Sequence, residues 1–194
     1  EGTRAIVVTL YCETDFVAQN QDFITCGNSI LETAWNDGIE KAKEVASSAI
    51  SSAVLTTGEN IQLGDIEIFE GAVIGSYTHF TGKNGVIVVL TGGAPELAKD
   101  IAMHISALKP HYLKSDDIKE EDKAKVIEVF KKEVEESGKP EDIKAKMLEG
   151  KLSGYFKEQT LLDQPFFKDD SVTVGALLTK ASAEVVSWKS YTIG

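Results

Sequence analysis

The hydrophobic period of this sequence changes at residues 57–60, Thr-Gly-Glu-Asn, and this change narrows the choice of folds more than any other pattern. Before the turn, residues 22–34 place apolar side chains on one helical stripe, and residues 37–48 continue as a second helix rich in Ala, Glu and Lys. After the turn, residues 61–69 and 72–80 have the character of strands. Helices followed by strands predict a small antiparallel sheet covered on one face by the helices, which is an α+β arrangement.

A hairpin is predicted where the second of these strands ends. Residues 86–90 are a run of Val, Ile and Leu, and they follow a segment that contains Gly82 and Gly85. Glycine accepts the positive φ angles that tight turns require, so we expect the hairpin tip at residues 81–85. Near the chain start, residues 4–11 are apolar on both faces, which predicts a buried or central strand.

The second half of the chain returns to helical spacing. Pro110 stops the first of its helices, because proline lacks a donor and restricts the residue before it. Dense Lys and Glu residues around the next helix indicate a solvated face. We expect helices at 94–108, about 118–136 and 141–156, a short helix at about 174–182, and a strand at 185–193.

Composition excludes several classes of function. The 194-residue chain has a net charge of −11, which disfavours direct binding to nucleic acid or anionic membranes. No run of about 18 apolar residues is present, so no membrane span is predicted. Two cysteines, Cys12 and Cys26, have no zinc or disulfide spacing, which indicates no metal site and a reducing, cytoplasmic setting.

The segment at residues 12–20 carries the first candidate functional residues. Thr14 or Asp15 can cap a short helix that starts directly after the first strand. Phe16 and Val17 would then lie in its first turn, near the surface. Phe16 is either a staple that closes the local core or an anchor for a partner, and residue type alone favours the staple.

This segment resembles the signature of the elongation factor Ts family. The matching residues are Thr14-Asp15-Phe16-Val17, preceded by Cys12-Glu13. Further similarity follows in the order of the family: the Tyr-x-His hairpin at residues 77–79 with Gly85, the segment 101–110, and the motifs at 138–140, 149–152 and 164–166. The chain departs from the family pattern at Lys83 and Asn84, in the hairpin tip.

The resemblance implies a guanine nucleotide exchange factor of the translational GTPase elongation factor Tu, without covalent chemistry, catalytic residues, cofactor or bound metal. It implies a cytoplasmic setting in bacteria, or in organelles that carry the same family. The residues expected to contact elongation factor Tu are Thr14, Asp15, Phe16, Val17, Gly85 and His104. Asn84 replaces a family residue that contacts the GTPase, so this one contact is not among those expected here.

The resemblance also implies a domain organisation. We expect two related subdomains, the first at residues 1–93 and the second at residues 94–140 with 183–194. Residues 141–182 are expected to project as a helical hairpin that could serve self-association as a homodimer or partner contact. The family's N-terminal three-helix module is expected before residue 1, and its C-terminal tail is expected to be shortened here.

Two other classes of function stay open from the residues alone. An enzyme could use Cys12 as a nucleophile with His79 or His104 as its base, although no third orienting motif is recognisable. A scaffold built on residues 141–182 would bind a partner without accelerating nucleotide release.

Overall fold

The computed structural model describes residues 2–193 and has the predicted α+β fold, with small antiparallel sheets packed against helices. Within those residues, no helix is both long enough and apolar enough to cross a membrane. In chain order the elements are β1 (Arg4–Tyr11), α1 (Asp15–Ala18), α2 (Gln21–Asp37), α3 (Ile39–Thr57), β2 (Gln62–Glu70), β3 (Val73–Thr78), β4 (Asn84–Leu90), α4 (Pro95–Leu108), α5 (Glu120–Glu136), α6 (Glu141–Gln159), β5 (Pro165–Phe166), β6 (Asp169–Thr173), α7 (Val174–Lys180) and β7 (Val185–Thr192), with 3-10 turns at Ser115–Asp117 and Leu161–Asp163.

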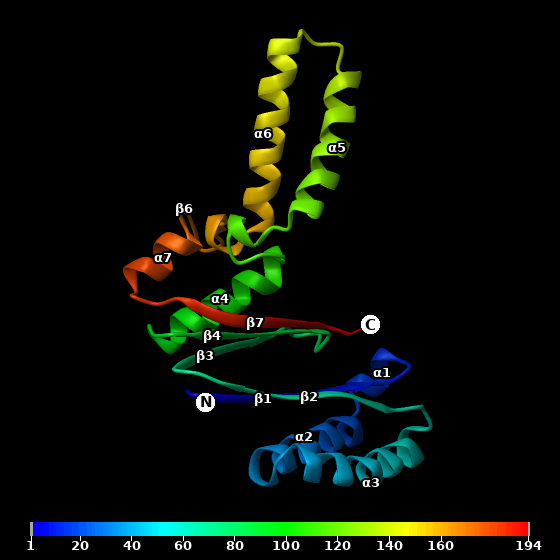
Figure 1. Cartoon of the computed structure of the whole chain (residues 1–194). Coiled ribbons are helices and arrows are strands. Elements are labelled where there is room, and N and C mark those ends of the chain that lie inside the picture. Colours follow the sequence, from blue (N-terminus) through cyan, green and yellow to red (C-terminus); the bar gives the residue numbers. More distant parts are fainter. Residues whose placement is uncertain (1, 194) are drawn as a thin grey trace.

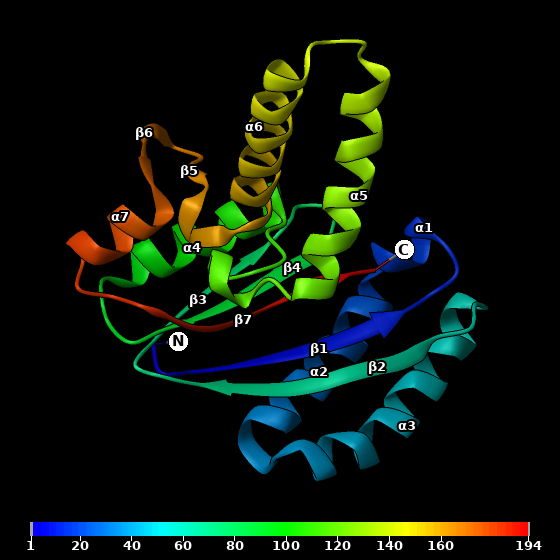
Figure 2. The same cartoon turned by 45° about the horizontal axis from the view of Figure 1, so that its top comes forward.

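The elements form layers in which two sheets lie between helices (Figure 1). Sheet β1-β2 packs on α2 and α3, and sheet β3-β4-β7 packs on α4. Between the sheets, the Glu67 carboxylate of β2 accepts a hydrogen bond from the Tyr191 hydroxyl of β7 at 3.0 Å and pairs with the Lys189 ammonium. Seen from a second direction, β1 and β2 still run as a separate pair above α2 and α3 (Figure 2).

Two predictions about the strands are wrong. The strand at residues 4–11 forms, but it is no buried central strand: β1 pairs with β2, and most of its residues are only partly buried. The three strands predicted for one sheet also separate, because β2 pairs with β1 while β3 pairs with β4. The physical reason is that β2 has its own apolar partner: Leu63 and Ile66 pack with β1 against the core of α2 and α3.

The buried side chains form two cores, and the chain passes from one to the other between β2 and β3. The first core lies among α1, α2, α3 and β1-β2, and the second lies among β4, α4, α7 and β7. These two cores do not divide at the expected subdomain boundary, residue 93. The strands β3 and β4, which precede that residue, form one sheet with β7, which follows it. Hydrophobic patterns along the sequence could not reveal that pairing.

The helical pair that projects from the core consists of α5 and α6 (Figure 1). Phe130 meets Tyr155 edge to face, with ring centroids 5.7 Å apart, and Lys151 pairs with Glu133 at 2.7 Å. The pair thus spans residues 120–159, whereas the expected module was 141–182. The later part of that module returns to the core, since Val174 and Leu178 of α7, one helical turn apart, are buried there.

A glycine lets α4 lie directly on β3. A Cβ atom built at Gly75 would stand 2.1 Å from the backbone carbon of Ala98, so any larger residue would force the helix away. Ala98 and Ala102 face the sheet on the helix side, and both are fully buried. The strand that leads into the hairpin tip is therefore fixed against α4 at close range.

Candidate partner-docking site

Helix α1 is a single turn whose two large apolar residues, Phe16 and Val17, point in different directions. Thr14 is the cap, as predicted, and its Oγ1 accepts a hydrogen bond from the Val17 backbone N–H at 3.3 Å. Val17 is buried in the first core, whereas the Phe16 side chain is 90% exposed. Consecutive helical residues are turned by about 100°, so packing one of them directs its neighbour outward. Val17, not Phe16, closes the local core, and the staple interpretation of Phe16 is wrong.

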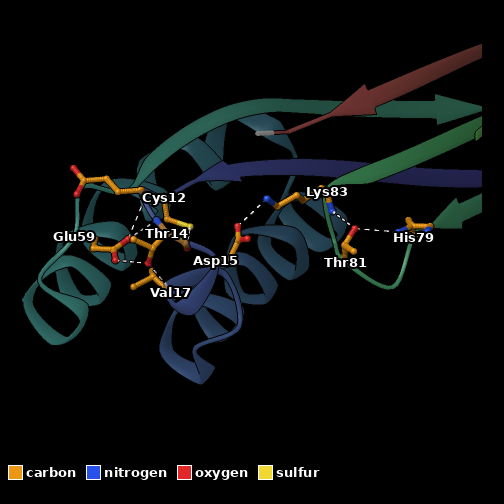
Figure 3. Close-up of polar contacts among 9 residues, drawn as sticks. Cys12, Thr14, Asp15, Val17, Glu59, His79, Thr81 and Lys83 are labelled. Atoms are coloured by element: carbon orange, nitrogen blue, oxygen red, sulfur yellow. Dashed lines mark hydrogen bonds and ion pairs between the residues drawn. The ribbon is translucent and has the colours of Figure 1, made fainter.

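Glu59 holds the segment that precedes α1. Its carboxylate accepts hydrogen bonds from the backbone N–H groups of Glu13 and Thr14, at 3.1 and 2.9 Å, and from the Thr14 hydroxyl at 2.5 Å (Figure 3). Hydrogen bonds to a charged acceptor are stronger than neutral ones. Sequence reasoning missed this residue, because Glu59 lies in the turn after α3, and no local pattern links it to residues 13 and 14.

Cys12 lies in the same segment but lacks the features of a nucleophile. Its Sγ–H donates to the Thr14 carbonyl at 3.3 Å. Burial raises the pKa of the Cys12 thiol, and the charge of nearby Glu59 raises it further. A raised pKa keeps the sulfur protonated, whereas catalytic cysteines need a lowered pKa. This environment argues against the enzyme that pairs Cys12 with His79 or His104.

The hairpin tip is a tight turn tied to α1. Gly82 has a φ of 71° and donates its N–H to the His79 carbonyl at 2.8 Å. The His79 N–H in turn donates to the Asn84 carbonyl at 2.8 Å. The Lys83 ammonium reaches Asp15 at 2.8 Å, so the tip and α1 meet (Figure 3). Such an exposed ion pair contributes about 0–1 kcal/mol, and the Asp15 carboxylate stays accessible to a donor of a partner.

Gly85 lies at the start of β4, next to the tip, and pairs with Thr78 and Tyr191 on the two sides. A Cβ built there would meet only the Tyr77 carbonyl oxygen, 3.9 Å away. Packing within the chain therefore does not demand a glycine at this position. Its bare backbone leaves space beside the tip, where the resemblance places a partner.

His104 lies elsewhere, inside the second core. Its side chain is 0% exposed, and Nε2 donates to the Gln164 side-chain oxygen at 2.8 Å while Nδ1 accepts the Phe167 N–H at 3.3 Å. The proton is assigned to Nε2 because the other nitrogen is an acceptor. Burial lowers the pKa of His104, which keeps it neutral. In this structure His104 therefore holds residues 164–167 against α4, and its contact with elongation factor Tu stays a prediction.

The predicted site residues therefore divide into two groups. Thr14, Asp15, Phe16, Val17 and Gly85 gather at the end of the sheets where α1 meets the hairpin tip. His104 does not join them. Within residues 2–193, no group of three or more His, Cys, Asp or Glu side chains is arranged to hold a metal ion. At this end of the molecule, the exposed ring of Phe16 lies on a turn that hydrogen bonds hold in place, an arrangement that favours binding to a protein partner.

Comparison with known proteins identifies the family of the chain. The family described as "Elongation factor TS" matches residues 13–194. Similar relatives are the proteins named Elongation factor Ts from Hahella chejuensis, 37% identical, Psychromonas ingrahamii, 40% identical, and Aeromonas hydrophila, 38% identical; each alignment covers 100% of this chain and 69% of the relative. The chain therefore belongs to the elongation factor Ts family, which implies guanine nucleotide exchange on elongation factor Tu in translation elongation.

Proposed function

We propose that this chain docks α1 and the hairpin tip onto elongation factor Tu and inserts Phe16 as a wedge beneath the Mg²⁺ and phosphate site of the GTPase. The observation that carries the proposal is the 90% exposure of Phe16 on a turn whose neighbour Val17 is buried. If an exposed aromatic ring is carried by a flexible loop, the backbone of that loop loses conformational entropy on binding. Here the cap of Thr14 and the three bonds of Glu59 have already fixed the backbone, so less ordering remains to be done.

The wedge needs no covalent step. Burial of a Phe side chain supplies about 1.5–3 kcal/mol, which can displace packed neighbours in the partner. Coordination of Mg²⁺ is strictly octahedral, so a displacement of about an ångström weakens both metal and phosphate binding. Asp15 is exposed, so it would accept a further charge-assisted bond from a donor on the GTPase while it stays paired with Lys83, and this bond would hold the segment in place.

Linkage gives the thermodynamic side of the proposal. A factor that binds nucleotide-free elongation factor Tu better than its GDP-bound form must lower GDP affinity by the same ratio. A coupling free energy of about 4 kcal/mol corresponds to about a thousandfold. The chain then stabilises the nucleotide-free GTPase until GTP binds. This exchange would take place in the bacterial cytosol, or in an organelle that carries the same family.

The test measures release of fluorescently labelled GDP from purified bacterial elongation factor Tu, with the chain in excess. We expect the wild-type chain to accelerate release and Phe16→Ala to lose most of the acceleration while its unfolding midpoint stays unchanged. Val186→Ala is the matched control, because Val186 is 60% exposed and lies at the far end of β7 from the hairpin tip. Equal acceleration by Phe16→Ala would contradict the wedge. Binding without acceleration by the wild-type chain would favour the scaffold.

Self-association as a homodimer through residues 141–182, which begin with α6 of the projecting pair, stays a prediction. Val129 and Ile143 are exposed apolar residues on these helices. Light scattering of the free chain at increasing concentration would test it, and a constant monomer mass would contradict it.

A further inference from the structure

A second exposed aromatic ring lies in the hairpin tip, which an ion pair joins to α1. Phe80, in the hairpin tip, is 90% exposed, the same fraction as Phe16. Phe80 is not among the residues that the resemblance led us to expect in contact with elongation factor Tu. Large apolar side chains that a fold leaves this exposed mark binding surfaces when they cluster. The Asp15–Lys83 ion pair joins the two segments that carry these rings.

The tip that carries Phe80 is built to hold its shape. The Phe80 ring packs against the His79 ring, with centroids 4.3 Å apart, and His79 meets Tyr77 edge to face at 6.4 Å. His79 Nδ1 also lies 3.0 Å from the Thr81 hydroxyl, which stands 3.4 Å from the Lys83 backbone N–H (Figure 3). The residues that flank Phe80, His79 and Thr81, are therefore both held by hydrogen bonds within the tip. The Phe80 ring projects from an ordered turn, so little backbone freedom remains to be lost when a partner covers it.

We propose that Phe80 is a second apolar anchor for the same GTPase, and that Lys83 is a positioning residue that keeps the two rings at a fixed separation. This inference rests on the proposed function. The occupant is elongation factor Tu because the Phe80 surface is continuous with the α1 surface, through the ion pair. A partner that covers Phe16 on α1 therefore lies beside the tip and meets Phe80.

The two rings have different tasks. Phe16 acts on the nucleotide site, so its contact must be stronger in the nucleotide-free complex. Phe80 lies on the neighbouring hairpin and contributes to docking in both complexes. An interaction that is equal in two states changes the concentration needed for half-maximal effect and leaves the maximal rate unchanged. Phe80 is thus an affinity anchor, and Phe16 an exchange wedge.

The experiment measures GDP release from elongation factor Tu over a range of chain concentrations. We expect Phe80→Ala to raise the half-saturating concentration about tenfold or more, with the maximal rate unchanged. Phe16→Ala should lower the maximal rate. Phe80→Leu should restore most of the affinity, and Val186→Ala should match wild type. Because Phe80 is exposed, its variants should unfold at the wild-type midpoint, which separates lost docking from lost folding.

Lys83 is tested in the same assay. Lys83→Ala should raise the half-saturating concentration about two- to fivefold, and Lys83→Arg should restore it, since Arg can also pair with Asp15. In the Phe80→Ala background, Lys83→Ala should have a smaller effect, because only one ring remains to be positioned.

The outcomes separate the two proposals. An unchanged half-saturating concentration for Phe80→Ala, with acceleration by the wild-type chain, would overturn the anchor and leave the exchange function intact. Acceleration that neither aromatic variant alters would overturn both residue assignments. A wild-type chain that binds elongation factor Tu without accelerating release would overturn the exchange function, and calorimetry would then test whether Phe80→Ala weakens that binding. No binding at all would overturn both proposals.

Discussion

Replacing Glu59 by Ala should loosen the α1 segment without unfolding the protein. The Glu59 carboxylate receives three hydrogen bonds from residues 13 and 14, and all three lie at the surface. No other contact in the described part of the chain satisfies the backbone N–H groups of Glu13 and Thr14. After the substitution, these groups can bond only to water. Val17 would stay in the core, while the backbone before it would gain freedom.

The magnitude follows from the three bonds. A surface hydrogen bond contributes about 0.5–1 kcal/mol net, so the loss of all three destabilises the ordered conformation of residues 13 and 14 by about 2 kcal/mol. If the docked conformation must be populated before binding, about 2 kcal/mol corresponds to an affinity lower by up to about 30-fold. The free energy of global unfolding should change by less, because an unfolded segment at the surface does not open either core.

Two measurements check this expectation. Amide hydrogen exchange should become faster at Glu13 and Thr14 and stay unchanged in α2 and α3. The half-saturating concentration in the GDP-release assay should rise in parallel. Glu184→Ala is the matched control, since it removes the same charge from an exposed side chain immediately before β7, at the end of the sheet away from the tip. Unchanged exchange at Glu13 and Thr14 would refute the role of Glu59, as would a loss of affinity that global unfolding fully explains.

Two further predictions concern the cores. Burial lowers the pKa of His104 below the ordinary 6.5, so the unfolded chain takes up this proton first as the pH falls, and the free energy of unfolding should decrease below about pH 6.5. In urea unfolding, the stability of His104→Gln should depend less on pH than that of the wild-type chain. An identical pH dependence would exclude His104 as the cause. Glu67→Ala removes the acceptor of the Tyr191 hydroxyl and the partner of Lys189. The free energy of unfolding, measured with urea, should therefore fall by about 1–2 kcal/mol. Stability equal to that of Glu184→Ala would argue that Glu67 does not hold the two sheets together.

Local patterns predicted most helices and strands, because the apolar period and the caps depend on neighbours in sequence. Helices at 94–108 and 118–136 form within two residues of their expected bounds, and Thr14 caps α1. Strand pairing was predicted less well. Both β1 and β3 could accept β2, and only the packing of α2 and α3 decides between them.

The site was predicted in part for a related reason. The position of Phe16 follows from the sequence, but its direction depends on which neighbour the core accepts, and the core accepts Val17. His104 sits on the margin of an apolar stripe, where spacing cannot tell a buried imidazole from an exposed one. Its burial is decided by Gln164 and Phe167, more than 50 residues later. Glu59 is likewise a long-range contact, and no signal in its own turn marks it.

The close approach of α4 to β3 at Gly75 has a mechanical consequence. β3 is fixed against α4 at Gly75, and the hairpin tip lies only a few residues further on, supported by pairing with β4 and by the Asp15–Lys83 ion pair. A force on the tip therefore acts over a short length of strand and is transmitted to α4 with little bending. A tip supported in this way can deform the surface that it presses against while it keeps its own shape. A larger residue at position 75 would separate β3 from α4, and the tip would then yield under the same force.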